Sequence, residues 1–426
     1  MISKDLKHIS ILCLFTSVLL LSTTSISAQR TSLDNAFGQL YRPFRLLALQ
    51  IIGRSSEDPQ NRQRIRSLEK EQKIYSKRTR SLDSFCDTNG PGRRSDTAPT
   101  SVHRLRPGDI DVIGAMGDSL TAGNGIYGTN LLQVTVENRG MVWSIGGQGT
   151  WREYLTLPNI LKEFNPNLYG YSLRDGLSTD RSSKFNVAEL GAMSRDIPYE
   201  AKILVKRMQR DPLVNMTDHW KMITLLIGNN DFCTDMCYYS NPQVVIKQHE
   251  RNMLKAYRYL RDTVPRLILN IVPPPNLRLL TKLSGLPQHC QTTLRFECPC
   301  LFGKSKSHLD YYEKIMKDWI AKDKEIVERE EFNTDTFTIN FQPFTLIDDF
   351  PRTANNNSDI RMFSADCFHL SQLSNAACSN VLWNNLFETD DQKSQFNANI
   401  METFRCPSEE HPYIVTRVNR RADFKV

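Results

Sequence analysis

Beyond residue 107 the chain contains short, largely apolar runs separated by longer segments of mixed polarity. Four of these runs cover residues 111–117, 221–228, 266–272 and 337–341. Continuous apolar runs of this length are typical of strands covered on both faces, as in a parallel sheet. We therefore expect four central strands.

Helical spacing appears between the strands. Met253, Tyr257 and Leu260 recur at i, i+4 and i+7, with basic residues between them, and residues 311–331 and 370–386 also predict helices. Strands that alternate with helices favour an α/β fold, a three-layer αβα sandwich with a central, mostly parallel sheet. In such sheets functional groups lie on loops at the carboxyl ends of the strands.

Residues 1–28 have the parts of a secretory signal peptide: early lysines, an apolar stretch over 9–21, and small residues at the end. A retained membrane anchor is the alternative, but this stretch is too short to span a bilayer. Residues 416–426 are charged and resemble no lipid-anchor signal. We expect a secreted, soluble protein, with glycans at the sequons of Asn215 and Asn356.

The basic residues are distributed unevenly along the rest of the chain. The 426 residues carry 54 Lys and Arg against 47 Asp and Glu, and 16 of the basic residues lie within 29–107 against 8 acidic ones. We therefore predict a basic N-terminal extension over 29–100 and a main domain over 101–426. The extension is interpreted as a solvated linker, a pro-segment, or a basic arm drawn to anionic lipid. No nucleic-acid-binding motif accompanies it.

Nine cysteines follow residue 28. In an oxidising compartment most should pair, and the odd number leaves at least one free or bonded to another chain. Metal binding is the alternative, but Cys233-x-x-x-Cys237 and Cys298-Pro-Cys300 lack a partner pair at zinc-finger spacing. We therefore expect disulfides and no metal.

The first segment with catalytic potential is Gly117-Asp118-Ser119-Leu120-Thr121, at the end of the first expected strand. A sharp turn there can present Ser119 at the edge of the sheet, where a nearby base could activate it. The pattern Gly123-x-Gly125-x-x-Gly128 is that of a dinucleotide site, but it begins too far from the strand end. We therefore exclude dinucleotide binding.

The second segment, Gly228-Asn229-Asn230-Asp231, also follows a strand. Taken alone it reads as an Asn/Asp turn, although an Asn amide there could donate to an oxyanion. The third segment is Asp366-Cys-Phe-His369, in which the carboxylate could hold one ring nitrogen of the imidazole. Cys367 could pin this loop through a disulfide, and Cys406 is the partner that we expect.

The order of these segments closely resembles that of the GDSL lipases, or SGNH hydrolases, and longer stretches resemble the phospholipase B branch of animals. The resemblance covers about residues 84 to 415 and leaves out 29–83. The stretches that carry it are 101–110, 114–125, 157–166, 220–233, 298–300, 364–370 and 382–385.

This resemblance implies the SGNH hydrolase fold and a role for each residue. Ser119 would be the nucleophile, His369 the general base and acid, and Asp366 the residue that orients His369. The oxyanion hole would consist of the backbone N–H of Ser119, that of Gly191, and the side chain of Asn230.

Further residues take lesser roles under the resemblance. Asp118 and Asp231 would fix the site loops through hydrogen bonds. Asn229 departs from the family's usual small residue, which concerns loop shape. Cys378 is an addition to the family's cysteines and is the candidate free thiol.

The function implied is hydrolysis of fatty acyl esters in phospholipids and lysophospholipids, without a cofactor and with transient contact to a membrane surface. An esterase, lipase or acyltransferase acting on other lipid esters is the alternative within the same chemistry. A secreted lipid-binding protein without turnover is the alternative from another class, but all three triad residues are present.

Overall fold

The computed structural model describes residues 85–420, and its centre is a five-stranded sheet with the strand order β1-β2-β3-β5-β4. All neighbouring pairs are parallel except β4 and β5. The strands are β1 (Ile110–Gly117), β2 (Trp220–Leu226), β3 (Leu267–Val272), β4 (Asn333–Thr334) and β5 (Phe337–Phe341). The four expected strands are confirmed, and the two-residue β4 is an addition at the edge.

The register of the sheet aligns the strand ends that matter for function. Gly117 of β1 pairs with Leu226 of β2, and Leu226 pairs with Val272 of β3. The loops that follow these three strands therefore leave the sheet at one edge, where ligands bind in open α/β sheets.

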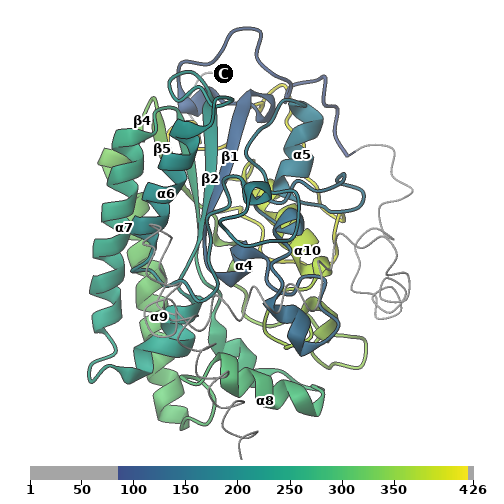
Figure 1. Ribbon diagram of the computed structural model, residues 1–426, viewed down its shortest axis with the longest axis vertical. Coiled ribbons are helices and arrows are strands. Elements are labelled where there is room, and N and C mark those ends of the chain that lie inside the picture. Colours follow the sequence, from purple (N-terminus) through teal and green to yellow (C-terminus); the bar gives the residue numbers. More distant parts are fainter. Residues whose placement is uncertain (1–84, 421–426) are drawn as a thin grey trace, which may run out of the picture.

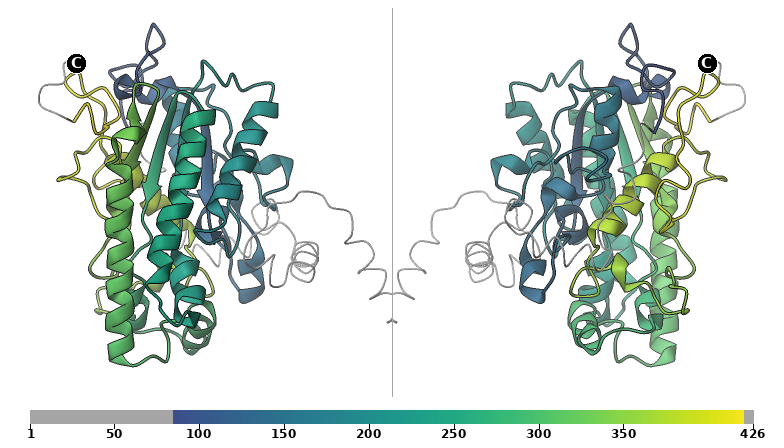
Figure 2. Two further views of the ribbon diagram at one scale, coloured as in Figure 1. Left: turned by 90° about the vertical axis from the view of Figure 1, so that its left-hand side faces the viewer. Right: turned by 90° about the vertical axis from the view of Figure 1, so that its right-hand side faces the viewer.

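Helices cover both faces of the sheet and form three layers (Figures 1 and 2). One face is covered by α5 (Leu157–Phe164) and α10 (Gln372–Asn385), and the other by α6 (Ile197–Arg210), α7 (Val244–Thr263) and α9 (Lys306–Val327). Each face has its own apolar core. The αβα sandwich expected from the sequence is confirmed.

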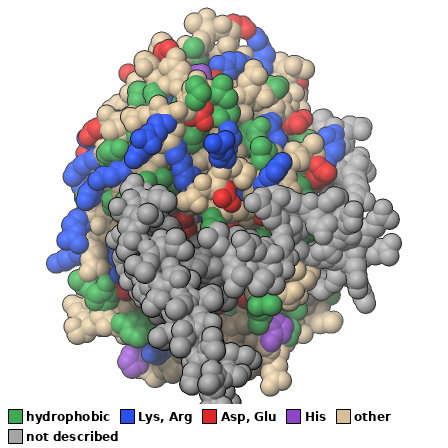
Figure 3. Space-filling model, in the orientation of Figure 1, with side chains coloured by type: hydrophobic (Ala, Val, Ile, Leu, Met, Phe, Trp, Pro, Cys, Tyr) green, Lys and Arg blue, Asp and Glu red, His purple; other side chains and the backbone are tan. Residues whose placement is uncertain are grey.

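The expected helices differ in how they are buried. Helix α7 is amphipathic, since Met253 and Tyr257 are buried while its outer side carries exposed basic residues. Figure 3 shows Lys and Arg side chains gathered over the side of the molecule where α7 lies in Figure 1. Helix α10, in contrast, is buried at every one of its 14 positions.

Two short helices lie at the carboxyl edge of the sheet. Helix α4 (Ser119–Ala122) follows β1 directly, and α8 (Gln288–Glu297) lies at the end of the molecule toward which β1 and β2 run (Figure 1). A five-residue π-helical turn, η6 (Asp231–Asp235), follows β2. These elements frame the region where the candidate residues lie.

Four disulfides join the described cysteines, and one expected pairing is wrong. Cys367 is bonded to Cys290, because α8 packs directly on the loop that contains Cys367. Cys406 is bonded to Cys86 instead. The free thiol is Cys378, as expected. The other two bonds are Cys233–Cys298 and Cys237–Cys300.

The residues that precede the sheet are attached to it. Besides the Cys86 disulfide, the Ser95 hydroxyl and backbone N–H both donate to Asp109, and Trp220 donates to the Pro99 carbonyl. The signal peptide and residues 29–84 of the extension lie outside the described residues, so both remain predictions. Within residues 85–420 no helix combines the length and apolarity needed to cross a bilayer.

Candidate active site

The turn after β1 places Ser119 at the sheet edge. Gly117 has φ 142°, and a Cβ on it would lie 2.3 Å from the Leu226 carbonyl oxygen, so only glycine fits there. Asp118 caps α4 by accepting a hydrogen bond of 2.9 Å from the backbone N–H of Leu120. The chain therefore changes direction within two residues and points Ser119 at the loop before α10.

Three of the predicted residues form one hydrogen-bonded chain. His369 Nε2 lies 2.8 Å from Ser119 Oγ, and His369 Nδ1 lies 2.5 Å from Asp366 Oδ2. The other carboxylate oxygen of Asp366 accepts from the backbone N–H groups of Phe368 and His369. With the ring proton on Nδ1, Nε2 is free to accept the serine proton. All three side chains are at most 4% exposed, so water competes little for these bonds.

The charges around His369 favour its protonated form. Burial alone would lower its pKa, but the charge and hydrogen bond of Asp366 outweigh burial and raise that pKa to about 9. Burial would raise the pKa of Asp366, but His369 holds it below its usual range. Burial also raises the pKa of Asp118 to about 6. The site is therefore arranged to stabilise an imidazolium.

Hydrogen bonds join the loop after β2 to the loop that contains Gly191. Asn230 Nδ2 donates to the Ala192 carbonyl at 2.9 Å, and Asp231 accepts from the N–H and hydroxyl of Ser194 at 3.0 and 2.9 Å. Gly191 itself is in the left-handed region, with φ 76°. Asn230 has a second amide N–H beyond the one given to Ala192. The oxyanion-hole role of Gly191 and Asn230 remains a prediction.

Asn229 has a more definite role than the sequence indicated. Its Nδ2 donates to Asp118 Oδ2 at 2.8 Å, with both side chains buried. This bond ties the loop after β2 to the turn that presents Ser119. The adjacent pair of asparagines could not be assigned from the sequence, because the pattern does not say which way each amide points.

Helix α8 was not predicted, yet it contacts the triad loop directly. Cys290 is bonded to Cys367, and Thr293 Oγ1 donates to the Asp366 carbonyl oxygen at 2.7 Å. At the end of the helix, a carboxylate oxygen of Glu297 lies within 4.8 Å of ligand atoms of both Asp366 and His369. Few apolar residues mark α8, so only the cysteines around it could have drawn attention to the segment.

Within residues 85–420, two groups of side chains have the composition of metal ligands. In the first, His289 lies beside Cys290 and Cys367, but the two sulfur atoms are bonded to each other and cannot act as thiolates. The second consists of Glu297, Asp366 and His369, of which the last two already share a hydrogen bond. Neither group is assigned as a metal site.

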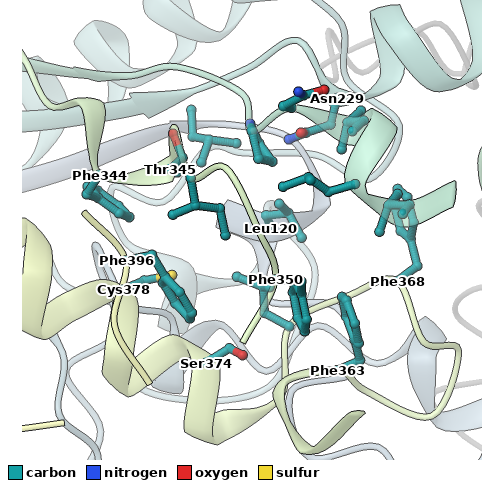
Figure 4. Close-up of a pocket in the computed structure, with 18 of the residues that line it drawn as sticks. Leu120, Asn229, Phe344, Thr345, Phe350, Phe363, Phe368, Ser374, Cys378 and Phe396 are labelled. Carbon is teal, nitrogen blue, oxygen red and sulfur yellow. The ribbon is translucent and has the colours of Figure 1, made fainter. Parts of the chain in front are cut away.

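An apolar pocket, shown in Figure 4, is lined by the sequence neighbours of Ser119 and His369. Its empty volume is about 910 Å³, part of it open to solvent, and aliphatic and aromatic side chains form most of its wall. Leu120 and Leu370, which follow Ser119 and His369 in sequence, both line it. In Figure 4 the pocket extends from Phe368 on one side to Cys378 and Phe396 on the other.

The sheet, the GDS turn and the Ser–His–Asp chain define the class of protein. Residues 113–382 match the family of GDSL-like lipases and acylhydrolases, and the chain belongs to that family. Among individual proteins it is similar to membrane-associated phospholipase B1, with 39% identity to the Homo sapiens protein over 340 residues and 35% to the Mus musculus protein over 349. These alignments cover 76% and 79% of this chain but only 23% and 22% of the relatives. The chain thus spans about a quarter of their length.

Solved structures with similarity to this chain include an extracellular lipase from Streptomyces rimosus and a phospholipase A1 from Streptomyces albidoflavus. Identity is 12% for the first and 14% for the second, with TM-scores of 0.31 and 0.32. The matches cover 64% and 65% of this chain and 98% of each of those chains.

Proposed function

We propose that this chain is a secreted serine ester hydrolase that removes fatty acyl chains from phospholipids and lysophospholipids. The observation that carries the proposal is the buried hydrogen-bonded chain from Ser119 through His369 to Asp366, beside an apolar pocket. Membership of the GDSL-like lipase family and similarity to phospholipase B1 give the substrate class its support.

Acylation would begin with proton transfer. As Ser119 Oγ attacks the ester carbonyl carbon, its proton passes to His369 Nε2, and Asp366 stabilises the imidazolium. Charge that develops on the carbonyl oxygen would be received by the N–H groups of Ser119 and Gly191 and the amide of Asn230. His369 then gives its proton to the departing lysophospholipid or glycerol oxygen, which leaves an acyl-serine.

Deacylation repeats these steps with water. His369 takes a proton from water as the water oxygen attacks the acyl-serine, and then returns it to Ser119 as the fatty acid leaves. The apolar pocket would hold the acyl chain throughout, because burying methylene groups there stabilises the complex by about 0.8 kcal/mol each. Each step uses only groups of this chain, backbone N–H groups included, and water, so the proposal includes no cofactor.

The proposed compartment rests on several independent features. The predicted signal peptide over 1–28 is supported by four disulfides, which persist in oxidising compartments. Asn215 and Asn356, the sequon asparagines, are both exposed. Contact with a membrane surface would be transient and would bring lipid to the pocket.

Labelling with a fluorophosphonate probe tests the mechanism. We expect stoichiometric labelling of Ser119, located by peptide mass spectrometry, and no labelling in Ser119→Ala or after heat denaturation. Labelling of another serine, or of none in the folded protein, would refute the triad. Release of fatty acid from phosphatidylcholine, lysophosphatidylcholine and triacylglycerol then tests the substrate class. Activity confined to triacylglycerol would refute the phospholipid assignment while leaving the triad intact.

A further inference from the structure

A carboxylate that this mechanism does not use lies beside the triad. Glu297 ends α8, its side chain is partly buried, and its carboxylate lies within 4.8 Å of the polar atoms of Asp366 and His369. Among residues 85–420 its carboxylate forms no hydrogen bond and no ion pair, and polar groups of Asp366 and His369 lie close to it. Burial raises the pKa of Glu297, and the charge of the nearby His369 imidazolium opposes that shift by favouring the ionised carboxylate.

The position of Glu297 is fixed by covalent bonds on both sides. Cys290, two turns earlier in α8, is bonded to Cys367 of the triad loop. Cys298, the next residue after Glu297, is bonded to Cys233, which follows Asn230 by three residues. The backbone around Glu297 is thus attached both to the loop of Asp366 and His369 and to the loop that follows β2.

The charges of three carboxylates, each from a different element, favour the protonated imidazole of His369. Asp366 lies in the same loop as His369, Asp118 caps α4, and Glu297 ends α8. Asp118 is bonded to Asn229, and Asp366 holds the ring directly. Of these three carboxylates, that of Glu297 has no hydrogen bond of this kind. Its charge helps to raise the pKa of His369.

We propose that Glu297 is a positioning residue for His369, whose imidazolium form its carboxylate favours as Ser119 attacks. The proton passes from Ser119 Oγ to His369 Nε2 as the bond to the carbonyl carbon forms, and Glu297 stays ionised throughout. Its contribution is electrostatic and acts through His369 rather than on the substrate. This inference rests on the proposed function.

The experiment compares pH profiles of kcat and KM for a soluble ester between wild type and Glu297→Gln. Loss of a charge about 5 Å from the ring should move the acid limb of kcat/KM to lower pH by about 0.5 to 1.5 units. The alkaline plateau of kcat should fall about 3- to 10-fold, because a less basic imidazole is a weaker general base. KM should change less than twofold, since Glu297 does not contact the acyl pocket.

Two further variants separate electrostatics from structure. Glu297→Asp keeps the charge, so the acid limb of its kcat/KM profile should lie close to that of the wild type. Glu163→Gln makes the same change of charge at an exposed position of α5, at the opposite end of the molecule from α8, and should leave the profile unchanged (Figure 1). Near-ultraviolet circular dichroism and the thermal midpoint check that each variant is folded.

The outcomes distinguish this inference from the proposed function. A Glu297→Gln profile that superimposes on wild type, or that falls equally at every pH, would overturn the role of Glu297. In either case Ser119 would still be labelled by the fluorophosphonate probe. Failure of the wild-type protein to label or hydrolyse esters would instead refute the proposed function.

Discussion

Filling the far end of the apolar pocket should change which acyl chains are accepted. Leu370, which precedes α10, and Ser374 and Cys378 within it all line the pocket, and the step of four residues from Ser374 to Cys378 advances about 6 Å along the helix. The pocket therefore extends along α10, away from His369. Cys378 is a free, buried thiol whose pKa burial raises to about 12, so its substitution removes no reactive group and no disulfide.

Cys378→Phe should discriminate against long chains. If the ring displaces about three methylene groups, at about 0.8 kcal/mol each, the loss is about 2.4 kcal/mol, or about 60-fold in kcat/KM. A butyryl ester that does not reach this depth should keep its rate within about twofold. The added volume should also destabilise the fold by about 1 to 3 kcal/mol, because α10 is buried on all sides.

The assay is hydrolysis of p-nitrophenyl esters from butyrate to palmitate, with Cys378→Ala as the control that removes volume instead of adding it. The alanine variant should keep the chain-length profile of the wild type. An equal loss for butyrate and palmitate in the phenylalanine variant would refute the reasoning. It would mean either that the acyl chain lies elsewhere or that the damage reaches the triad.

Four other results are expected. Asn230→Ala should lower kcat by about 10² to 10³ with the thermal midpoint nearly unchanged, and near-normal turnover would show that it is no oxyanion donor. Since Ser119 needs a neutral His369 whose pKa is raised to about 9, kcat/KM should climb from pH 7 toward pH 9; a plateau already reached at pH 7 would contradict this. Phe296, which is 82% exposed beside Glu297, should matter only at lipid surfaces, so Phe296→Ser should slow hydrolysis of vesicles but not of soluble esters. A chain lacking residues 29–83 keeps Cys86 and should hydrolyse soluble esters at the full rate; loss of that activity in folded protein would place the extension in the site.

The sequence predicted the sheet well because each central strand is buried on both faces. Strand β2 is buried at all seven positions of Trp220–Leu226, and apart from Lys221 and Thr224 its residues are apolar, which makes the run easy to recognise in the sequence. Helix α10 was also expected, but its uniform burial removes the amphipathic pattern that would locate its ends. Helix α8 was missed because only Cys290 and Leu294 of its ten residues are buried, so its sequence shows no apolar stripe.

Within the candidate site, the sequence predicted the residues better than their connections. Ser119, Asp366 and His369 lie in short motifs whose order resembles that of the GDSL lipases, and the structure joins the three side chains in one hydrogen-bonded chain, while their catalytic roles stay a prediction. The partner of Cys367 does not follow, because connectivity depends on how α8 packs over the loop. The same holds for Asn229 and Glu297, whose roles depend on loops that are distant in sequence.

These connections link the loops around Ser119 to one another in a closed ring, here called the circuit. They involve loops because the residues of the site lie on loops and not on the strands. A misplacement of about 1 Å can cost about 10²-fold in rate, so a site assembled from separate loops needs each loop held to the next. Beyond the strand ends the loops have only isolated bridges such as Phe363–Leu370, and side-chain hydrogen bonds and disulfides supply the other connections. In circuit order the links are Asp118–Asn229, Cys233–Cys298, Cys290–Cys367 and finally His369–Ser119, and the bond Asn230–Ala192 attaches the Gly191 loop to this circuit as a side branch. Since the circuit closes through the reacting atoms themselves, loosening any one link should lower turnover before it lowers the stability of the fold.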